Sequence, residues 1–176
     1  MPFELQPTLT GKLVVLRPLL EDDFEALYAV AADPLVWEQH PASNRHEPEV
    51  FRALFRESMD SGGCLVAIDA DNGRVIGSSR FHGYNEAASE IEIGWSFLAR
   101  RYWGGKYNGE MKRLMLEHAF RFVQRVLFLV GPDNIRSQRA VEKIGAIRAG
   151  SRADASGRES FVYAIAVDSA FPARSR

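Results

Sequence analysis

The sequence is poor in the features that would assign a class at once. It contains one cysteine, four histidines and no apolar run near the roughly 20 residues that span a bilayer. The single cysteine, Cys64, excludes an internal disulfide framework and fits a reducing compartment. The first residues also lack the basic and apolar regions of a signal peptide. We therefore expect a cytoplasmic protein without a membrane partner.

The charge of the chain is nearly balanced, with 22 Lys and Arg against 23 Asp and Glu and a net charge of −1. Nucleic-acid binding needs a broad cationic surface, so we expect no nucleic-acid partner. The scattered histidines and the lone cysteine show no metal-ligand spacing, and we expect no metal site. What is abundant is apolar residues, at 46% of the chain, enough for a substantial core.

At 176 residues we expect a single domain over 1–176, with an N-terminal arm at 1–10 and a loose C-terminal tail at 168–176. Hydrophobic periodicity and turn residues predict an alternating series of elements. The predicted elements are strand 13–18, helices 21–32 and 48–61, strands 65–69, 74–81 and 90–97, helix 108–124, strand 126–130, helix 134–144, and strands 147–152 and 160–167. This order predicts an α/β (α+β) fold with about seven strands and about four flanking helices. Strict alternation in 90–97 predicts that Ile91, Ile93, Trp95 and Phe97 share one face.

The turn at 101–108 is the most informative segment, because it joins a predicted strand to a predicted helix. A helix start exposes backbone N–H groups without intrahelical partners, and the helix dipole adds partial positive charge there. Glycines at 104 and 105 remove Cβ atoms and let a ligand approach the backbone. The turn is therefore predicted to bind an anion such as a phosphate or pyrophosphate.

Strand, glycine turn, helix, buried strand and asparagine-capped helix follow one another in an order that resembles the GNAT superfamily of acyl-CoA-dependent N-acyltransferases. Within it, the chain looks most like the branch that contains the ribosomal-protein N-terminal acetyltransferases. The motifs that carry the resemblance are IGWSF at 93–97, RYWGG at 101–105 and DNIRSQRAVEKIGA at 133–146, within a similarity that covers 13–167.

The resemblance implies a mixed, mostly antiparallel sheet and an enzyme that moves an acetyl group from acetyl-CoA to a primary amine by direct transfer. The acceptor amine is either a protein N-terminus or a small molecule. The competing interpretation is a non-catalytic CoA-binding sensor or scaffold. Oligomeric state is open between a monomer and a homodimer.

The resemblance also implies which residues bind CoA. The pantetheine arm and thioester would lie along the fourth family strand, and Asn134 would hold the pantetheine through its amide. The residues implied along the strand are Trp95, Ser96, Phe97 and Leu98. The residues implied at the pyrophosphate are Arg101, Trp103, Gly104, Gly105, Lys106, Tyr107 and Asn108. Arg139, with Arg136 and Lys143, is a candidate for the CoA 3′-phosphate.

Two of these positions have alternative interpretations. The family signature is Gln/Arg-x-x-Gly-x-Gly/Ala, and Lys106 occupies its last small position. Its backbone N–H can still donate to a phosphate, with the side chain swung outward and its ammonium adding to phosphate binding, or that side chain can crowd the turn and weaken CoA binding. Asn134 alone is also explained as a helix N-cap.

For catalysis, Glu92 is the candidate base, because it leads into the cleft end of its strand. Its alternatives are a counter-charge for the substrate ammonium or a solvated polar face. Ser137 lies three residues after Asn134 and is a candidate acid for the leaving sulfur, or a residue that solvates the first helical turn. Acceptor identity depends on the loops at 37–47 and 81–89, which contain His40 and His82.

Overall fold

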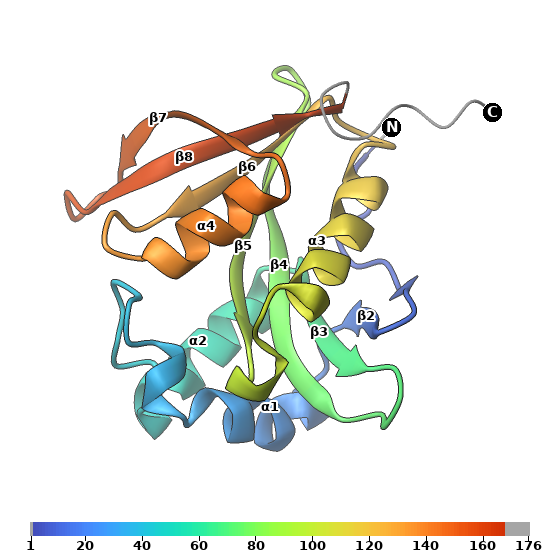
Figure 1. Ribbon diagram of the computed structural model, residues 1–176, viewed down its shortest axis with the longest axis vertical. Helices are drawn as coiled ribbons and strands as arrows, with labels where there is room; N and C mark the ends of the chain where they lie inside the picture. Colours follow the sequence, from blue (N-terminus) through green and yellow to red (C-terminus); the bar gives the residue numbers. More distant parts are fainter. Residues whose placement is uncertain (1, 168–176) are drawn as a thin grey trace.

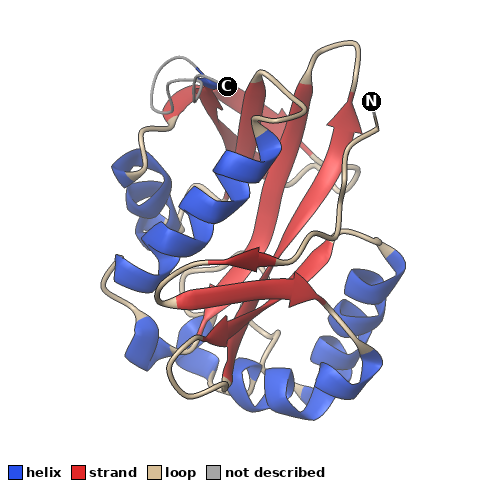
Figure 2. Cartoon of the chain, turned by 90° about the vertical axis from the view of Figure 1, so that its right-hand side faces the viewer, coloured by secondary structure: helices blue, strands red, loops and turns tan. Residues whose placement is uncertain are grey.

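The computed structural model describes residues 2–167, so the predicted tail at 168–176 lies outside the described residues. Its centre is one eight-stranded sheet, with strand order β1-β2-β3-β4-β5-β6-β8-β7 (Figures 1 and 2). The strands are β1 Leu9–Thr10, β2 Val14–Pro18, β3 Cys64–Asp69, β4 Val75–Asn85, β5 Glu90–Leu98, β6 Arg125–Val130, β7 Ile147–Ala153 and β8 Glu159–Ala166. Every neighbouring pair is antiparallel except β5 and β6. The predicted class is confirmed, and the extra strand is β1, which lies inside the segment predicted to be an arm.

In the described part of the chain, four α-helices cover the sheet, two on each face. They are α1 Phe24–Ala31, α2 Pro48–Asp60, α3 Lys106–Ala119 and α4 Ile135–Lys143, with short 3₁₀ turns at η1 Glu21–Asp23, η2 Pro34–Val36 and η3 Arg100–Tyr102. Helices α3 and α4 pack on one face and α1 and α2 on the other, around two buried clusters. Strand β3 contributes to both clusters, with Leu65 facing α3 and Val66 facing α1 and α2.

The boundaries of α3 differ from the predicted 108–124. The helix begins at Lys106 because Gly105, at φ 95°, turns the chain into it. It ends at Ala119, and the residues that follow form a turn. The apolar pattern continues through Phe122 and Val123, since these residues pack against the same core from the turn that follows. Periodicity therefore identified the buried residues correctly and overran the helix end.

The parallel pair β5–β6 is short, and this shapes the molecule. The two strands are paired only where Glu90–Glu92 lies beside Arg125–Leu127. Beyond that point β5 continues to Leu98 and β6 to Val130 without pairing with each other, and Figure 1 shows them diverging. Backbone groups along this side of β5 are thus free of sheet hydrogen bonds and available to a ligand.

A β-bulge in β5 changes which side chains reach that gap. Ser78 pairs with Phe97 and Arg80 with Gly94, so two residues of β5 oppose Ser79 alone. One of them, Trp95, has φ 51°.

The predicted common face for Ile91, Ile93, Trp95 and Phe97 is consequently wrong. Ile91 and Ile93 pack toward α3, whereas Trp95 and Phe97 pack toward α1 and α2. The extra residue reverses the alternation of side chains along the strand.

Ser96, the second bulged residue, meets a buried lysine of α3. Its Oγ lies 2.7 Å from Ser79 Oγ, and it accepts a hydrogen bond from Lys112 Nζ. Lys112 also donates to Ser79 Oγ at 3.3 Å, and its side chain is buried beside the Phe128 ring. Burial away from any carboxylate of the described residues lowers the pKa of Lys112 to about 7.

We expect Lys112→Met to flatten the pH dependence of stability. The folded-state pKa of about 7 lies below the ordinary lysine value of 10.5, so the unfolded chain binds one more proton between these values. Lys112 therefore contributes a rise of about 1.4 kcal/mol per pH unit to the free energy of unfolding of the native protein in this window. Methionine is also unbranched, is one heavy atom shorter than lysine, and has no amine that titrates.

Urea unfolding at about pH 7.5 and about pH 8.5 measures the slope, and any titration of Cys64 in the unfolded chain contributes equally to the native protein and to the variant. Lys12→Met, at an exposed lysine, is the matched control and should keep the native slope. Equal slopes for Lys112→Met and the native protein would contradict a buried neutral amine.

Candidate active site

A cavity of about 510 Å³ opens where β5 and β6 separate. Its walls come from β5, the turn before α3, the start of α4, the loop after η2 and the β7–β8 hairpin. The predicted site residues that line it are Glu92, Trp95, Ser96, Phe97, Leu98, Trp103, Gly104, Gly105, Asn108, Asn134, Arg136 and Ser137. One cavity therefore gathers segments that lie far apart in the sequence.

Five candidate residues do not line this cavity, and one of them, Lys143, is exposed at the end of α4. Lys106 and Arg139 are exposed, and Lys106 thus extends its side chain outward from the first turn of α3. Arg101 and Tyr107 line a separate hollow beside Asp69. The Arg101 guanidinium stacks 5.1 Å from the Tyr102 ring centre and donates to its hydroxyl at 3.3 Å. A sequence signature identifies the position of Arg101 but not the direction of its side chain.

The turn before α3 has the features of an anion site. Gly104 and Gly105 have φ 113° and 95°, and the first intrahelical bond runs from Gly109 N–H to Gly105 O at 2.7 Å. The backbone N–H groups at the start of α3 therefore lack intrahelical partners, and among the described residues no side chain caps this end. Lys143 Nζ lies 2.6 Å from the position that a Cβ on Gly105 would take, so an ammonium stands beside the amides. Amides, dipole and ammonium all favour negative charge here.

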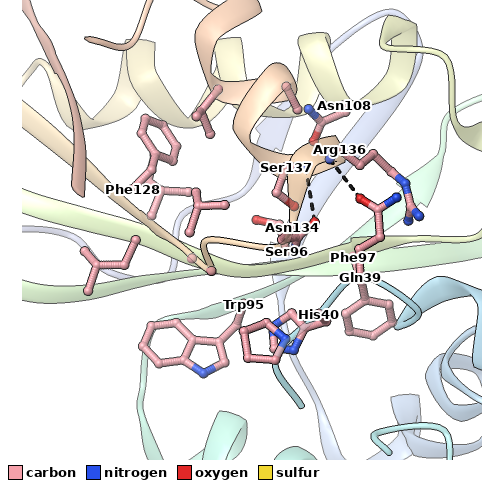
Figure 3. Close-up of a pocket in the computed structure, with 18 of the residues that line it drawn as sticks. Gln39, His40, Trp95, Ser96, Phe97, Asn108, Phe128, Asn134, Arg136 and Ser137 are labelled. Atoms are coloured by element: carbon pink, nitrogen blue, oxygen red, sulfur yellow. Dashed lines mark hydrogen bonds between the residues drawn. The ribbon is translucent and has the colours of Figure 1, made fainter. Parts of the chain in front are cut away.

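Asn134 caps α4 and faces the cavity. Its Oδ1 accepts a hydrogen bond from Ser137 N at 3.3 Å, and its side chain is buried (Figure 3). The predicted capping role is thus confirmed. The Asn134 Nδ2 and the Ser137 hydroxyl donate to no other described residue, so both remain available to a ligand in the cavity.

Gln39 lines the cavity and was not identified from the sequence. Its Oε1 accepts from Arg136 N at 3.0 Å, which satisfies an N–H at the start of α4 (Figure 3). The Arg136 guanidinium in turn lies 3.8 Å above the Trp103 ring centre. These two contacts therefore connect the loop after η2, the start of α4 and the turn before α3. A glutamine in an irregular loop carries no periodic signal that would have revealed this contact.

Lys112 is a second lining residue that sequence reasoning missed. Its signal was present, because position 112 falls on the apolar stripe of α3 between Met111 and Met115. A charged residue at a buried helical position often marks a functional environment.

Glu92 lies on the opposite face of β5 from Ile91 and Ile93. It pairs across the ladder with His82 and is half-buried, and burial raises the pKa of its carboxyl while Arg152 and Arg80 oppose that rise. A carboxylate whose pKa is raised toward neutrality is suited to accept a proton. Figure 3 shows Trp95 and His40 on one side of β5, and Asn134 and Ser137 on the other.

Within residues 2–167, no helix is long and apolar enough to cross a membrane. In the same described part of the chain, no cluster of three or more His, Cys, Asp or Glu side chains is placed to hold a metal ion.

Comparison with known proteins places the chain in a family. The family model described as the acetyltransferase (GNAT) domain matches residues 14–147. The uncharacterized N-acetyltransferase YnaD of Bacillus subtilis is 27% identical over 144 residues, which cover 81% of this chain and 84% of that protein.

Solved structures share the fold. A GCN5-related N-acetyltransferase from Brucella melitensis has a TM-score of 0.84 at 20% identity, covering 98% of this chain and 83% of that one. RimJ of Mycobacterium smegmatis, in complex with CoA-disulfide, has a TM-score of 0.63 at 20% identity, covering 88% and 82%. Because the family match spans most of the chain, from residue 14 to residue 147, this protein belongs to the GNAT family of acetyltransferases.

Proposed function

We propose that this protein is an N-acetyltransferase that moves the acetyl group of acetyl-CoA directly to a primary amine. The observation that carries the proposal is the continuity between the unpaired side of β5 and the uncapped start of α3. The first can bind an amide-bearing arm as an added strand, and the second can bind a diphosphate. CoA contains both groups in that order.

The residues present fit CoA. The unpaired backbone after Ile93 would bind the pantetheine amides, with Asn134 Nδ2 donating from the other side. The amides after Gly105, together with Lys143, would bind the pyrophosphate. Bound acetyl-CoA supplies an acetyl thioester, whose carbonyl a peptide N–H of β5 near the bulge would polarise.

Direct transfer needs a proton acceptor and a proton donor. Glu92 would take the proton that the amine loses as the carbon–nitrogen bond forms. Ser137 would give its hydroxyl proton to the sulfur as the carbon–sulfur bond breaks. Cys64 supports direct transfer over an acyl-enzyme, because it is 2% exposed, lies outside the cavity lining and has a pKa raised to about 11 by burial.

The acceptor class follows from the same chemistry. Either a protein N-terminus or a small-molecule amine can present a neutral nitrogen to Glu92. The resemblance to the ribosomal-protein acetyltransferase branch supports the first, and the enclosing loop at Gln39 and the β7–β8 hairpin support the second by limiting the space.

Gly104→Val should weaken CoA binding by at least about tenfold, or about 1.4 kcal/mol. At φ 113° a β-branched residue is strained, and its methyl groups would enter the open space beside the amides. Isothermal titration calorimetry with CoA measures the affinity.

The matched control for this variant is Gly62→Val. Gly62 has φ 65° and similarly open surroundings but lies outside the cavity lining. It should lose comparable stability and keep CoA affinity. Unchanged CoA affinity in Gly104→Val would remove the pyrophosphate assignment.

Glu92→Gln should lower kcat by about 10²- to 10⁴-fold and leave CoA affinity intact. In the native enzyme, activity should fall as the pH drops through the raised pKa of Glu92, because only the ionised carboxylate accepts a proton. The variant should lose this acid limb of the rate profile.

Glu90→Gln is the control, since Glu90 lies on the same strand face but pairs with Arg125 at 3.5 Å, away from the cavity. Initial rates with a panel of amines test both variants. If Glu92→Gln retains native rates at every pH, the base lies elsewhere. If the native protein binds CoA but turns over none of the amines, the result supports a CoA-binding sensor and not an enzyme.

A further inference from the structure

The cavity wall on the same side of β5 as Glu92 carries more positive charge than an amine substrate requires. Its wall includes Arg45 from the loop after η2 and Arg158 from the β7–β8 hairpin. Arg80 lies behind this wall, where it donates to Glu57 at 3.0 Å and to Ser58 at 2.7 Å and stacks on Trp95. Arg80 thus has a carboxylate partner, whereas among the described residues Arg45 forms no ion pair.

Arg45 faces a histidine that cannot accept its hydrogen bond. The Ala42 backbone N–H donates to His40 Nδ1 at 2.9 Å. A backbone N–H can only donate, so Nδ1 is the acceptor and the neutral ring carries its proton on Nε2. Arg45 Nη1 lies 3.3 Å from that same Nε2. Two donors therefore meet at one point of the cavity wall, and an oxygen acceptor between them would satisfy both.

The pair is held in place by the core rather than by its own charges. Trp37 is 2% exposed and its indole N–H donates to Ala31 O at 2.8 Å. Arg45 lies 5.5 Å above the Trp37 ring centre, and the His40 ring packs edge-on against it at 5.8 Å. The two donors are thus preorganised by one buried indole.

Electrostatics around the pair favours an anion. Burial and the charges of Arg80 and Arg158 lower the pKa of Arg45 to about 10, although Glu57 opposes the shift. Burial, Arg45 and Arg158 lower the pKa of His40 to about 4, so the ring is neutral at pH 7 and its Nε2 remains a donor. Asp154 also lines this wall as a carboxylate, and the hydrogen bonds from the Ser156 side chain and the Arg158 backbone, together with the charge of Arg158, lower its pKa. Its charge therefore offsets Arg158, whereas the charges that act on Arg45 are those of Glu57, Arg80 and Arg158.

We infer that Arg45 Nη1 and His40 Nε2–H form an anion subsite, and that the acceptor is a small zwitterion with a carboxylate or phosphonate close to its amine. This inference rests on the proposed transferase function. Glu92 binds the amine end and the Arg45–His40 pair binds the acidic end, so opposite charges on the cavity wall match opposite charges on the substrate. Arg45 and Arg158 disfavour a polyamine, which would bring several positive charges to the same wall.

The test measures kcat/KM, with acetyl-CoA as the acetyl donor, for pairs of acceptors in which one member carries an anionic group and the other does not. The pairs are L-phenylalanine with L-phenylalaninamide and aminomethylphosphonate with methylamine; spermidine and an uncharged-side-chain peptide complete the panel. We expect the anionic member of at least one pair to be favoured at least about tenfold. The amide has the less basic amine of its pair, so amine protonation cannot produce that preference. The two pairs separate a carboxylate from a phosphonate.

Arg45→Met tests the subsite directly. It should raise KM for the favoured acceptor at least about tenfold and bring the kcat/KM ratio within the pair close to one. Arg52→Met is the control, because Arg52 also stacks on an aromatic ring, at 5.1 Å from the Phe24 centre, but lies outside the cavity lining. It should retain the preference. Calorimetry with CoA checks that each variant keeps its cofactor groove.

The outcomes separate the two proposals. Turnover that is equal within each pair, or a preference for spermidine or the peptide, overturns the anion subsite and leaves the transferase intact. Absence of turnover with every amine overturns the transferase, and the subsite falls with it. A native preference that Arg45→Met leaves unchanged also overturns the assignment.

Discussion

The short parallel contact between β5 and β6 is the constraint on which the rest of the molecule depends. The strands share hydrogen bonds only at Glu90–Glu92 and Arg125–Leu127, and then separate. Had they stayed paired, the sheet would be continuous and the cavity would not exist. Because β6 is paired along its whole length with β8, the gap does not leave it as a loose edge. The opening is therefore a stable part of the fold, which a rigid sheet holds ready for a ligand.

The cavity has two chemically different sides, and each inherits its character from the face of the sheet to which it belongs. Toward α3 and α4 it presents backbone amides and Asn134, and the ammonium of Lys143 lies beside Gly105. Toward α1 and α2 it presents Glu92, His40 and Arg45. Gln39 joins the two sides through the start of α4. A thioester bound where β5 and β6 separate would thus lie between two walls. One wall is suited to bind a long polar arm, and the other is suited to bind a small charged molecule.

The sequence predicts much of this, and the failures have physical reasons. Periodicity identified the four helices and every strand except β1, and the asparagine cap was found because capping chemistry is local. The bulge at Trp95 was missed, since it depends on how β4 and β5 register and not on alternation within β5. The Arg45–His40 pair was missed because an irregular loop assembles it on Trp37 through contacts that no pattern encodes. Lys112 was visible as a charge on an apolar stripe, but its partners come from two other strands.

The bulge has a consequence for how β5 can vary. Removing one residue between Gly94 and Phe97 would restore regular pleating and exchange the two faces of the strand beyond that point. Phe97 would then turn toward α3 and Leu98 toward α1 and α2, opposite to their present packing. Substitutions in this segment keep the register of β5, whereas an insertion or deletion would move every later side chain of the strand to the opposite face.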